Sequence, residues 1–464
     1  MGTSSENAAG AGRGTAVPKE VDYANYFCTY SFLYHQKEML SDRVRMDAYF
    51  NAVFENKHHF KDKVVLDVGA GSGILAIWSA QAGAKKVYAV EATKMSEHAR
   101  ALVKANNLEQ VVEVIEGSVE DITLPEKVDV IISEWMGYFL LRESMFDSVI
   151  WARDRWLKPT GVMYPSHARM WMAPIRTGIV DQKLGDYQSA MGDWHNFVDE
   201  TKAFYGVDMS TLAKPFAEEQ RKYYLQTSLW SNLHPHQVIG TAGIIKEIDC
   251  LTATVAEIEK VRSKFSLSIT MENTKLCGFG GWFDVHFRGR SEDPAEHEIE
   301  LTTAPSVDYC THWGQQVFLL NPPTHVSEGD ELSVNFVMSR SKGNHRLMEF
   351  RFLCLWSFKQ YPRKHYCMIC NLMELTVIKG YCSALFGDDW INLVLVLVPK
   401  FQAKLEADPR FSLNIFMMLF TEVCIYLLFN CGTAEFLATL RPYYRIRIEM
   451  LHLLEIFPCL HKMV

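Results

Sequence analysis

Two glutamates that lie nine residues apart have the spacing with the clearest chemical meaning in this sequence. Glu134 and Glu143 bracket a loop that contains Gly137 and several aromatic residues, directly after a predicted strand. If the loop folds back on itself, both carboxylates face one point. Such a pair suits either acid–base chemistry or the binding of a guanidinium, whose fork of donors can use two carboxylates at once. Two solvated loop residues without a function are the alternative.

A glycine-rich turn lies earlier in the chain, between a predicted strand and a predicted helix. Its glycines, Gly69, Gly71 and Gly73, permit a tight turn and a close approach of a ligand to the backbone. A dinucleotide fingerprint would need a further small residue at position 74, where this chain has Ile74. The pattern therefore favours a nucleoside ligand without a pyrophosphate.

Three further positions carry polar side chains that suit such a ligand or its chemistry. Glu91 ends the next predicted strand, about twenty residues past the turn, where an acid can accept both ribose hydroxyls. Glu120, beside Val119, could accept a hydrogen bond from the exocyclic amine of adenine. His312 lies in a Thr-His-Trp turn with no metal-ligand cluster beside it, and a lone histidine is more often structural than catalytic. Solvated or structural roles therefore remain open for each.

The elements that must position these residues alternate between strand and helix. This pattern predicts a parallel sheet with helices on both faces. After Met163 short alternating runs predict an antiparallel β domain, preceded by a helical, aromatic insertion at about 181–233. The predicted elements are strands at 64–68, 86–90, 111–115 and 128–133, helices at 74–82 and 96–106, and β runs at 240–248, 264–271, 281–287, 316–319 and 332–338.

The composition is that of a globular protein, but it is uneven along the chain. The 464 residues have a formal net charge of −8 and are 48% hydrophobic, which excludes a largely disordered, collagen-like or multi-span membrane chain. Residues 1–349 carry 46 acidic and 35 basic residues, whereas residues 350–464 carry 9 and 12. The last segment also holds 7 of the 11 cysteines and 70 apolar residues. The acidic excess argues against nucleic-acid binding and suits basic partners, and the cysteines indicate free thiols in a reducing compartment.

These motifs together resemble the protein arginine N-methyltransferase family from about residue 22 to residue 349, and most of all its plant class numbered ten. The resemblance rests on the Tyr26-Phe27-x-x-Tyr30 helix, Glu38-Met39-Leu40-x-Asp42-x-x-Arg45, the glycine turn, the two-glutamate loop and Thr311-His312-Trp313. It implies a Rossmann-like domain that uses S-adenosyl-L-methionine (SAM), followed by an antiparallel β-barrel domain with a helical dimerisation arm. The expected parts are a disordered tail at 1–20, the SAM-binding domain with N-terminal helices at 21–163, the barrel at 164–349 and an atypical tail at 350–464.

The resemblance also assigns roles to single residues. Glu134 and Glu143 would hold the substrate guanidinium, and His312 would pair with Asp42, so that these four form the expected catalytic set. Met39 matches the type I branch, which makes asymmetric dimethylarginine, where the symmetric branch has Phe. No metal is expected. The expected SAM-binding residues are Arg45 at the methionine carboxylate, Asp67, Gly69 and Gly71 lining the pocket, Glu91 at the ribose, and Val119 and Glu120 at the adenine; the expected substrate pocket consists of Tyr26, Tyr30, Met39 and Trp313.

The family implies basic protein substrates such as histones and Gly/Arg-rich proteins, a homodimer formed through the arm, and a nuclear and cytoplasmic location. No direct nucleic-acid or membrane binding is expected. One residue departs from the family pattern, because Gly314 stands where a lysine often follows Thr-His-Trp. The alternative is a catalytically weak isoform that acts as a dimerising or dominant-negative partner.

The last 115 residues fit none of these expectations. The segment 347–356 alternates in part and could serve as one replacement strand, although the loss of the family's closing strands would leave a sheet edge open. Residues 412–430 are nearly long enough to span a membrane but contain Glu422. Cys367-x-x-Cys370 lacks the partner pair of a zinc site. The segment is interpreted as an alternative, apolar and cysteine-rich end.

Overall fold

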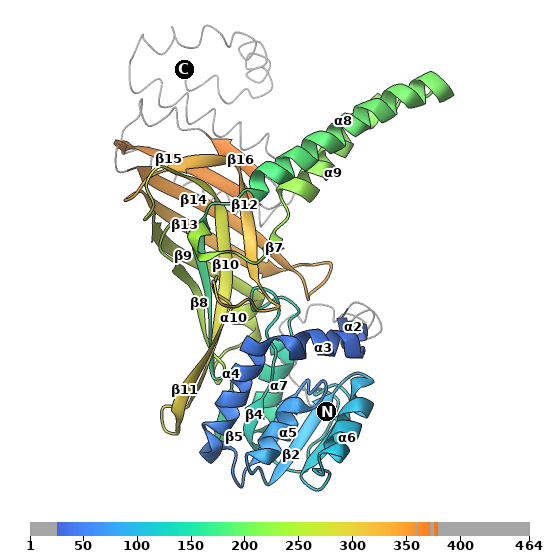
Figure 1. Cartoon of the computed structure of the whole chain (residues 1–464), viewed down its shortest axis with the longest axis vertical. Coiled ribbons are helices and arrows are strands. Elements are labelled where there is room, and N and C mark those ends of the chain that lie inside the picture. Colours follow the sequence, from blue (N-terminus) through green and yellow to red (C-terminus); the bar gives the residue numbers. More distant parts are fainter. Residues whose placement is uncertain (1–25, 359–360, 372–374, 379–464) are drawn as a thin grey trace, which may run out of the picture. The chain divides into compact units, whose positions relative to one another are not determined.

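The computed structural model describes residues 26–358, 361–371 and 375–378, and side chains as far as Cys354 (Figure 1). The chain divides into two compact units, Met1–Tyr381 and Cys382–Val464, and every described residue belongs to the first. The expected tail at 1–20 and the apolar segment at 412–430 lie outside the described residues. Within the described part of the chain, no helix is long and apolar enough to cross a membrane.

The N-terminal sheet is parallel, with the strand order β3-β2-β1-β4-β5. Its central strand is buried along its whole length, as expected for a sheet that helices cover on both faces. The edge strand β5 was not predicted from the sequence, because its Lys-Pro-Thr-Gly segment is typical of a turn. The strands are β1 (Val64–Val68), β2 (Lys86–Glu91), β3 (Val112–Glu116), β4 (Val128–Ile132) and β5 (Leu157–Tyr164).

Helices precede and connect these strands. Between α3 and α4 only Asp42 intervenes; its extended backbone ends one helix and its side chain caps the next by accepting a hydrogen bond from the Arg45 N–H at 3.1 Å. The two residues are thereby placed together at one helix terminus. The helices are α2 (Cys28–Tyr30), α3 (Leu33–Ser41), α4 (Arg43–Phe54), η2 (Lys57–His59), α5 (Ile74–Gln81), α6 (Met95–Ala105) and α7 (Phe146–Trp156).

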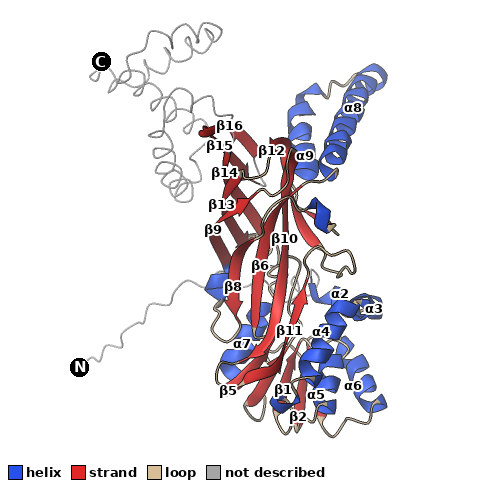
Figure 2. Cartoon of the chain, turned by 60° about the vertical axis from the view of Figure 1, so that its left-hand side comes forward, coloured by secondary structure: helices blue, strands red, loops and turns tan. Residues whose placement is uncertain are grey.

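Two antiparallel sheets make up the β domain, which is drawn in red above the parallel sheet in Figure 2. One has the order β7-β12-β10-β6-β8, with β11 also paired to β10, and the other has the order β16-β15-β14-β13-β9. The strands are β6 (His167–Ile175), β7 (Leu229–Ser231), β8 (Gly243–Asp249), β9 (Lys260–Ser268), β10 (Thr274–Gly289), β11 (Pro294–Thr302), β12 (Gln315–Val326), β13 (Glu331–Arg340), β14 (Met348–Phe358), β15 (Tyr361–Asn371) and β16 (Leu375–Ile378), with α10 (Val255–Glu259) before β9.

The helical insertion expected at 181–233 is an antiparallel pair of helices between β6 and β7. It consists of α8 (Ile179–Tyr205) and α9 (Ala213–Leu225), which lie side by side in both views (Figures 1 and 2). We call α8 and α9 the arm. Large apolar side chains on the arm are exposed, including Phe204 at 77% and Tyr205 at 80%.

The boundary expected at residue 349 falls inside β14 and is not a boundary of the fold. This strand pairs with β13 over its length, from Met348 opposite Arg340 to Ser357 opposite Glu331. The replacement strand expected at 347–356 is therefore confirmed. An open sheet edge was expected at this point. That expectation is wrong, because β14, β15 and β16 continue the sheet.

The β domain core explains why β14 belongs to it. Phe352 is 4% exposed and packs beside Phe318 and Phe336 of the two facing sheets, with ring centroids 4.8 and 5.1 Å apart. Phe350 lies at 5.0 Å from Phe318. The first residues of the atypical segment thus fill the interior of the barrel.

Candidate active site

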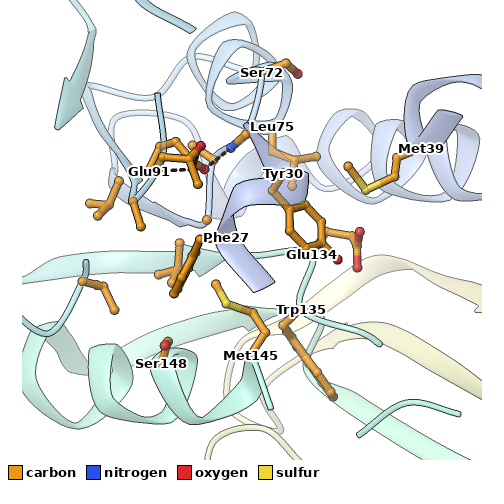
Figure 3. A pocket seen from close by; sticks show the side chains of 18 of the residues that line it. Phe27, Tyr30, Met39, Ser72, Leu75, Glu91, Glu134, Trp135, Met145 and Ser148 are labelled. Atoms are coloured by element: carbon orange, nitrogen blue, oxygen red, sulfur yellow. Dashed lines mark hydrogen bonds between the residues drawn. The ribbon is translucent and has the colours of Figure 1, made fainter. Parts of the chain in front are cut away.

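One pocket lies at the carboxyl ends of β1, β2 and β4, where open α/β sheets bind ligands (Figure 3). The glycine turn, the N-terminal helices and the two-glutamate loop all contribute to its walls. The expected site residues that line it are Tyr26, Tyr30, Met39, Arg45, Gly69, Gly71, Glu91, Val119, Glu120, Glu134 and Glu143.

The glycine turn has a conformation and surroundings that exclude larger residues. Gly69 and Gly71 have φ of +73° and +53°, in the left-handed region. A Cβ at Gly69 would lie 2.7 Å from Met145, and one at Gly71 would lie 2.9 Å from the Gln36 amide oxygen. The backbone of the turn is therefore a wall of the pocket, as a nucleoside site requires.

Glu91 projects from the end of β2 and is tied to the turn. One carboxylate oxygen accepts a hydrogen bond from the Gly71 N–H at 2.8 Å, and the other accepts two from the N–H and hydroxyl of Thr93, at 2.8 and 2.6 Å. A carboxylate can accept about four hydrogen bonds. It therefore keeps accepting capacity for a ribose hydroxyl while its position is held.

The far end of the pocket carries Val119 and Glu120. Val119 is buried, and Glu120 accepts hydrogen bonds from the Ser118 hydroxyl and, at 2.6 Å, from the Ser148 hydroxyl. An apolar side chain beside a fixed carboxylate suits a purine with an exocyclic amine.

Arg45 lies in this pocket beside Glu134. Its Nε donates to a Glu134 carboxylate oxygen at 3.1 Å, and its Nη1 donates to the Met39 carbonyl oxygen at 3.3 Å. Both charged side chains are about nine-tenths buried. The arginine thus balances the charge of one of the two expected catalytic carboxylates. It also offers a cationic site for a ligand carboxylate.

Asp67 does not line the pocket, contrary to expectation. It is fully buried on β1, against the backbone of Ala76 in α5, and burial raises the pKa of its carboxyl group to about 8. The side chain lies between sheet and helix, whereas the turn that follows the strand reaches the pocket. Its position indicates a structural role below the site.

The two-glutamate loop folds back as expected. A Cβ at Gly137 would overlap the backbone oxygen of Arg142, so the two halves of the loop touch. Phe139, Leu140 and Glu143 are non-glycine residues with φ of +49°, +67° and +79°. Conformations of this kind persist only where surrounding contacts hold them.

Glu143 is brought into the pocket beside the N-terminal helix. The Tyr30 hydroxyl donates to its carboxylate at 2.6 Å. Burial, assisted by the charge of Glu134, raises the pKa of Glu143 above its ordinary value, although the Tyr30 hydrogen bond opposes the shift. The two carboxylates therefore share one desolvated region, and an added cation would relieve their repulsion.

His312 and Asp42 form the expected pair, but neither lines the pocket. The Asp42 carboxylate accepts from the His312 backbone N–H at 2.9 Å and lies 2.7 Å from its Nδ1. Burial of Asp42 is outweighed by these bonds and that from Arg45, which hold its pKa below the ordinary value. The pair joins the Thr-His-Trp turn to the start of α4.

Trp313, expected in the substrate pocket, is not among the residues that line the pocket. Its side chain is 3% exposed, packs against the His312 ring at 4.0 Å and donates from Nε1 to the Met136 carbonyl oxygen at 2.9 Å. Its contact instead holds the two-glutamate loop.

Arg346, in the turn between β13 and β14, is a site residue that the sequence reading missed. Its backbone oxygen accepts from the Glu143 N–H at 2.7 Å, and its Nη1 donates to the Glu143 carbonyl oxygen at 2.5 Å. Its guanidinium lies 3.8 Å from the centroid of the Tyr26 ring. No local motif marks it, because its partners lie about 200 and 320 residues away in the sequence.

A nucleoside pocket at the ends of a parallel sheet, with two carboxylates at its inner end and an antiparallel β domain behind them, defines a SAM-dependent arginine methyltransferase. Residues 167–359 match the family model described as the arginine methyltransferase oligomerization subdomain, and residues 29–147 match a model for ribosomal protein L11 methyltransferase. The chain belongs to the protein arginine N-methyltransferase family.

Its relatives include protein arginine N-methyltransferase PRMT10 of Arabidopsis thaliana, 73% identical over 354 residues, which cover 76% of this chain and 92% of that protein. The PRMT10 of Oryza sativa subsp. japonica is 66% identical over 352 residues, which cover 76% of this chain and 93% of that protein. The crystal structure of Arabidopsis thaliana protein arginine methyltransferase 10, in an open conformation, matches with a TM-score of 0.73 at 70% identity, over 75% of this chain and 100% of that one. The Trypanosoma brucei PRMT1 enzyme–prozyme complex with AdoHcy matches with a TM-score of 0.59 at 31% identity, over 74% and 98%.

The pocket fits the cofactor of this family. The glycine turn leaves a cradle that a Cβ would fill, Glu91 keeps free acceptor positions, and Arg45 supplies the cation for an amino-acid carboxylate. SAM, when bound, supplies an electrophilic methyl group, and arginine is methylated.

Proposed function

We propose that this chain is a type I enzyme, which forms monomethylarginine and asymmetric dimethylarginine in basic proteins such as histones and Gly/Arg-rich proteins. The observation that carries the proposal is that Glu134, Glu143 and Met39 line one pocket. Met39 is the residue that the family resemblance places in the asymmetric-product branch. The acidic excess of residues 1–349, with 46 acidic against 35 basic side chains, supports a cationic substrate.

The carboxylates act on the guanidinium by position and charge. Glu134 and Glu143 hold its fork of donors and orient one nitrogen toward the cofactor side of the pocket. Their fixed charges also stabilise the positive charge that is redistributed as the methyl group is transferred. Both act inside a buried pocket, where such interactions are stronger than in water.

Glu143 is the proton acceptor that the geometry favours. Its raised pKa brings it closer to the working pH of a general base, and it lines the pocket directly. The pair of His312 and Asp42 does not reach the pocket lining. We therefore assign that pair the role of fixing the Thr-His-Trp turn against α4.

We also propose that the chain forms a homodimer through the arm. The match to an oligomerization subdomain and the exposed aromatic residues Phe204, Tyr205 and Tyr223 support an interface there. A nuclear and cytoplasmic location would give such a dimer access to histones and to Gly/Arg-rich proteins.

Transfer of label from SAM to histone and Gly/Arg-rich peptides tests the function, with amino-acid analysis of the product. The full chain, Glu143→Gln and Glu109→Gln are compared, because Glu109 is an exposed glutamate outside the site. Labelled asymmetric dimethylarginine from the first and third proteins is expected, with at least a hundredfold loss for Glu143→Gln. Only symmetric dimethylarginine would refute the type, and no label at all would refute the enzyme.

A second candidate is a catalytically weak, dimerising isoform. The sequence from residue 350 onward favours it, because residues 350–464 differ in charge and cysteine content from the rest. In that case the chain would dimerise without methylating peptides. A version ending at residue 381, where the first compact unit ends, would then regain activity if the remaining segment is inhibitory.

A further inference from the structure

We propose that Trp230, at the base of the arm, is a positioning residue for the two-glutamate loop, and that Gly314 is the residue that admits it. The inference rests on arginine methylation by the pocket described above, not on the product type. It assigns a function to Gly314, which stands where a lysine often follows Thr-His-Trp in the family. Neither residue lines the pocket.

Trp230 connects the arm to the Thr-His-Trp turn. It lies on β7, five residues after α9 ends at Leu225, and its Nε1 donates to the Trp313 carbonyl oxygen at 2.8 Å. The short strand is itself held, because the Gln316 side chain donates to the Leu229 carbonyl oxygen at 2.9 Å. The indole is therefore fixed in place although it is 51% exposed.

Trp313 in turn contacts the two-glutamate loop. Trp313 Nε1 donates to the Met136 carbonyl oxygen at 2.9 Å, and the Met136 N–H donates to a carboxylate oxygen of Glu134 at 3.1 Å. Three successive hydrogen bonds thus lead from β7, which follows the arm, to a carboxylate that lines the pocket. The same Trp313 ring packs against His312, which is anchored on Asp42.

Gly314 is matched to the indole. Its φ is +48°, and a Cβ built on it would lie 2.7 Å from Trp230 Nε1, 2.8 Å from Trp230 Cε2 and 3.0 Å from the Ser231 carbonyl oxygen. A side chain at this position would push the indole away from the Trp313 carbonyl oxygen. Glycine at position 314 and tryptophan at position 230 therefore depend on each other.

The loop needs external support of this kind. Phe139, Leu140 and Glu143 hold positive φ, which costs free energy for residues other than glycine. Without the Trp230 bond, the Thr-His-Trp turn loses one of its fixed points, and Met136 and Glu134 shift with it. Even a small misplacement of a carboxylate lowers the rate, because catalysis depends on alignment.

The first experiment is Trp230→Phe, which retains an aromatic ring and removes the donor. We expect kcat to fall roughly fivefold, the typical value of one hydrogen bond, with KM for SAM unchanged. The melting temperature and the sedimentation of the protein should equal those of the wild type. Thr227→Val, which removes an exposed side-chain hydrogen bond to the Lys222 carbonyl oxygen just after α9, is the control and should leave kcat unchanged.

The second experiment is a double-mutant cycle. Gly314→Ala is measured alone and in a Trp230→Ala background; the strain from positive φ is present in both and cancels. We expect Gly314→Ala to lower kcat at least fivefold more in the wild type than in the Trp230→Ala background. Equal losses of kcat in the two backgrounds would show that Gly314 and Trp230 do not depend on each other.

A binding measurement separates this inference from the proposed function. The affinity for an arginine peptide is measured with S-adenosylhomocysteine present, so that no turnover is needed. A loss of about fivefold for Trp230→Phe supports the positioning role even if the wild type proves inactive. If Trp230→Phe changes both kcat and peptide affinity less than about twofold, the inference is wrong.

Discussion

The hydroxyl of Tyr30 donates a hydrogen bond of 2.6 Å to the carboxylate of Glu143, so that a short N-terminal helix and a loop more than 100 residues later meet at one carboxylate of the pocket. A hydrogen bond to a charged acceptor is stronger than one between neutral groups. This contact joins the N-terminal helix to the two-glutamate loop inside the pocket.

Tyr30→Phe should lower kcat/KM by roughly ten- to a hundredfold, the value of a hydrogen bond to a charged group. Since the Tyr30 bond lowers the pKa of Glu143, its loss should raise that pKa further. Steady-state kinetics from pH 5 to 9 would show the acid limb of kcat/KM at higher pH. Tyr34→Phe, at a residue that is 61% exposed, serves as control and should leave the limb in place.

The pH dependence of the wild type should follow the ionisation of Glu143. Burial and the neighbouring Glu134 raise its pKa, so the carboxylate needed to hold the guanidinium and accept a proton is lost as the pH falls through this raised value. As the pH is lowered, activity should therefore decline with a midpoint above the ordinary pKa of a glutamate. In Glu143→Gln the residual activity should lack this limb, and a limb of equal midpoint would exclude Glu143 as its origin.

Asp67→Asn should stabilise the protein at neutral and higher pH. The folded state keeps Asp67 protonated up to a pKa of about 8, whereas the ordinary value is 3.8, so stability decreases as the pH rises through this window. The amide keeps the shape without the buried charge. Melting temperatures should be several degrees higher than for the wild type at pH 8 and similar at pH 5. Asp199→Asn, on an exposed position of α8, should show no such difference.

Arg346→Lys should lower kcat although it keeps the charge. Lysine lacks the planar guanidinium that donates to the Glu143 carbonyl oxygen and stacks on Tyr26 at the same time. A loss of about tenfold is expected, with little change in the binding of S-adenosylhomocysteine by calorimetry. Arg351→Lys, at an exposed position on β14, is the control. Equal activity of both variants would remove Arg346 from the site.

Shortened versions of the chain should fold only if they retain β14. A version ending at residue 349 loses Phe350 and Phe352 from the barrel core, and the removal of a single buried phenylalanine side chain costs about 3–5 kcal/mol. We expect this version to be insoluble or unfolded by circular dichroism. A version ending at residue 381 should fold. A folded, active 1–349 protein would show that the strand is dispensable.

The sequence allowed most of the parallel sheet and the pocket to be predicted, because buried strands and the glycine turn are local patterns. β11 was not predicted, because its apolar residues Ala295, Ile299 and Leu301 alternate with three glutamates and only Leu301 is buried, so the pattern is weak. Asp67 and Trp313 were expected in the pocket from the family resemblance, because a motif match alone does not tell which side of a strand or turn faces the ligand. Arg346 and Trp230 act only through contacts between distant parts of the chain, which no single sequence reveals.

The pairing of β14 with β13 also constrains what sequence can follow the enzyme domain. Phe350 lies 6.0 Å from Phe139, the residue at the tip of the two-glutamate loop, and Phe352 closes the same cluster. Any coding change that exchanges the end of this protein must therefore still deliver large apolar side chains at positions 350 and 352. An ending without them would remove the aromatic side chains that pack beside the two-glutamate loop, which lies about 200 residues earlier in the chain.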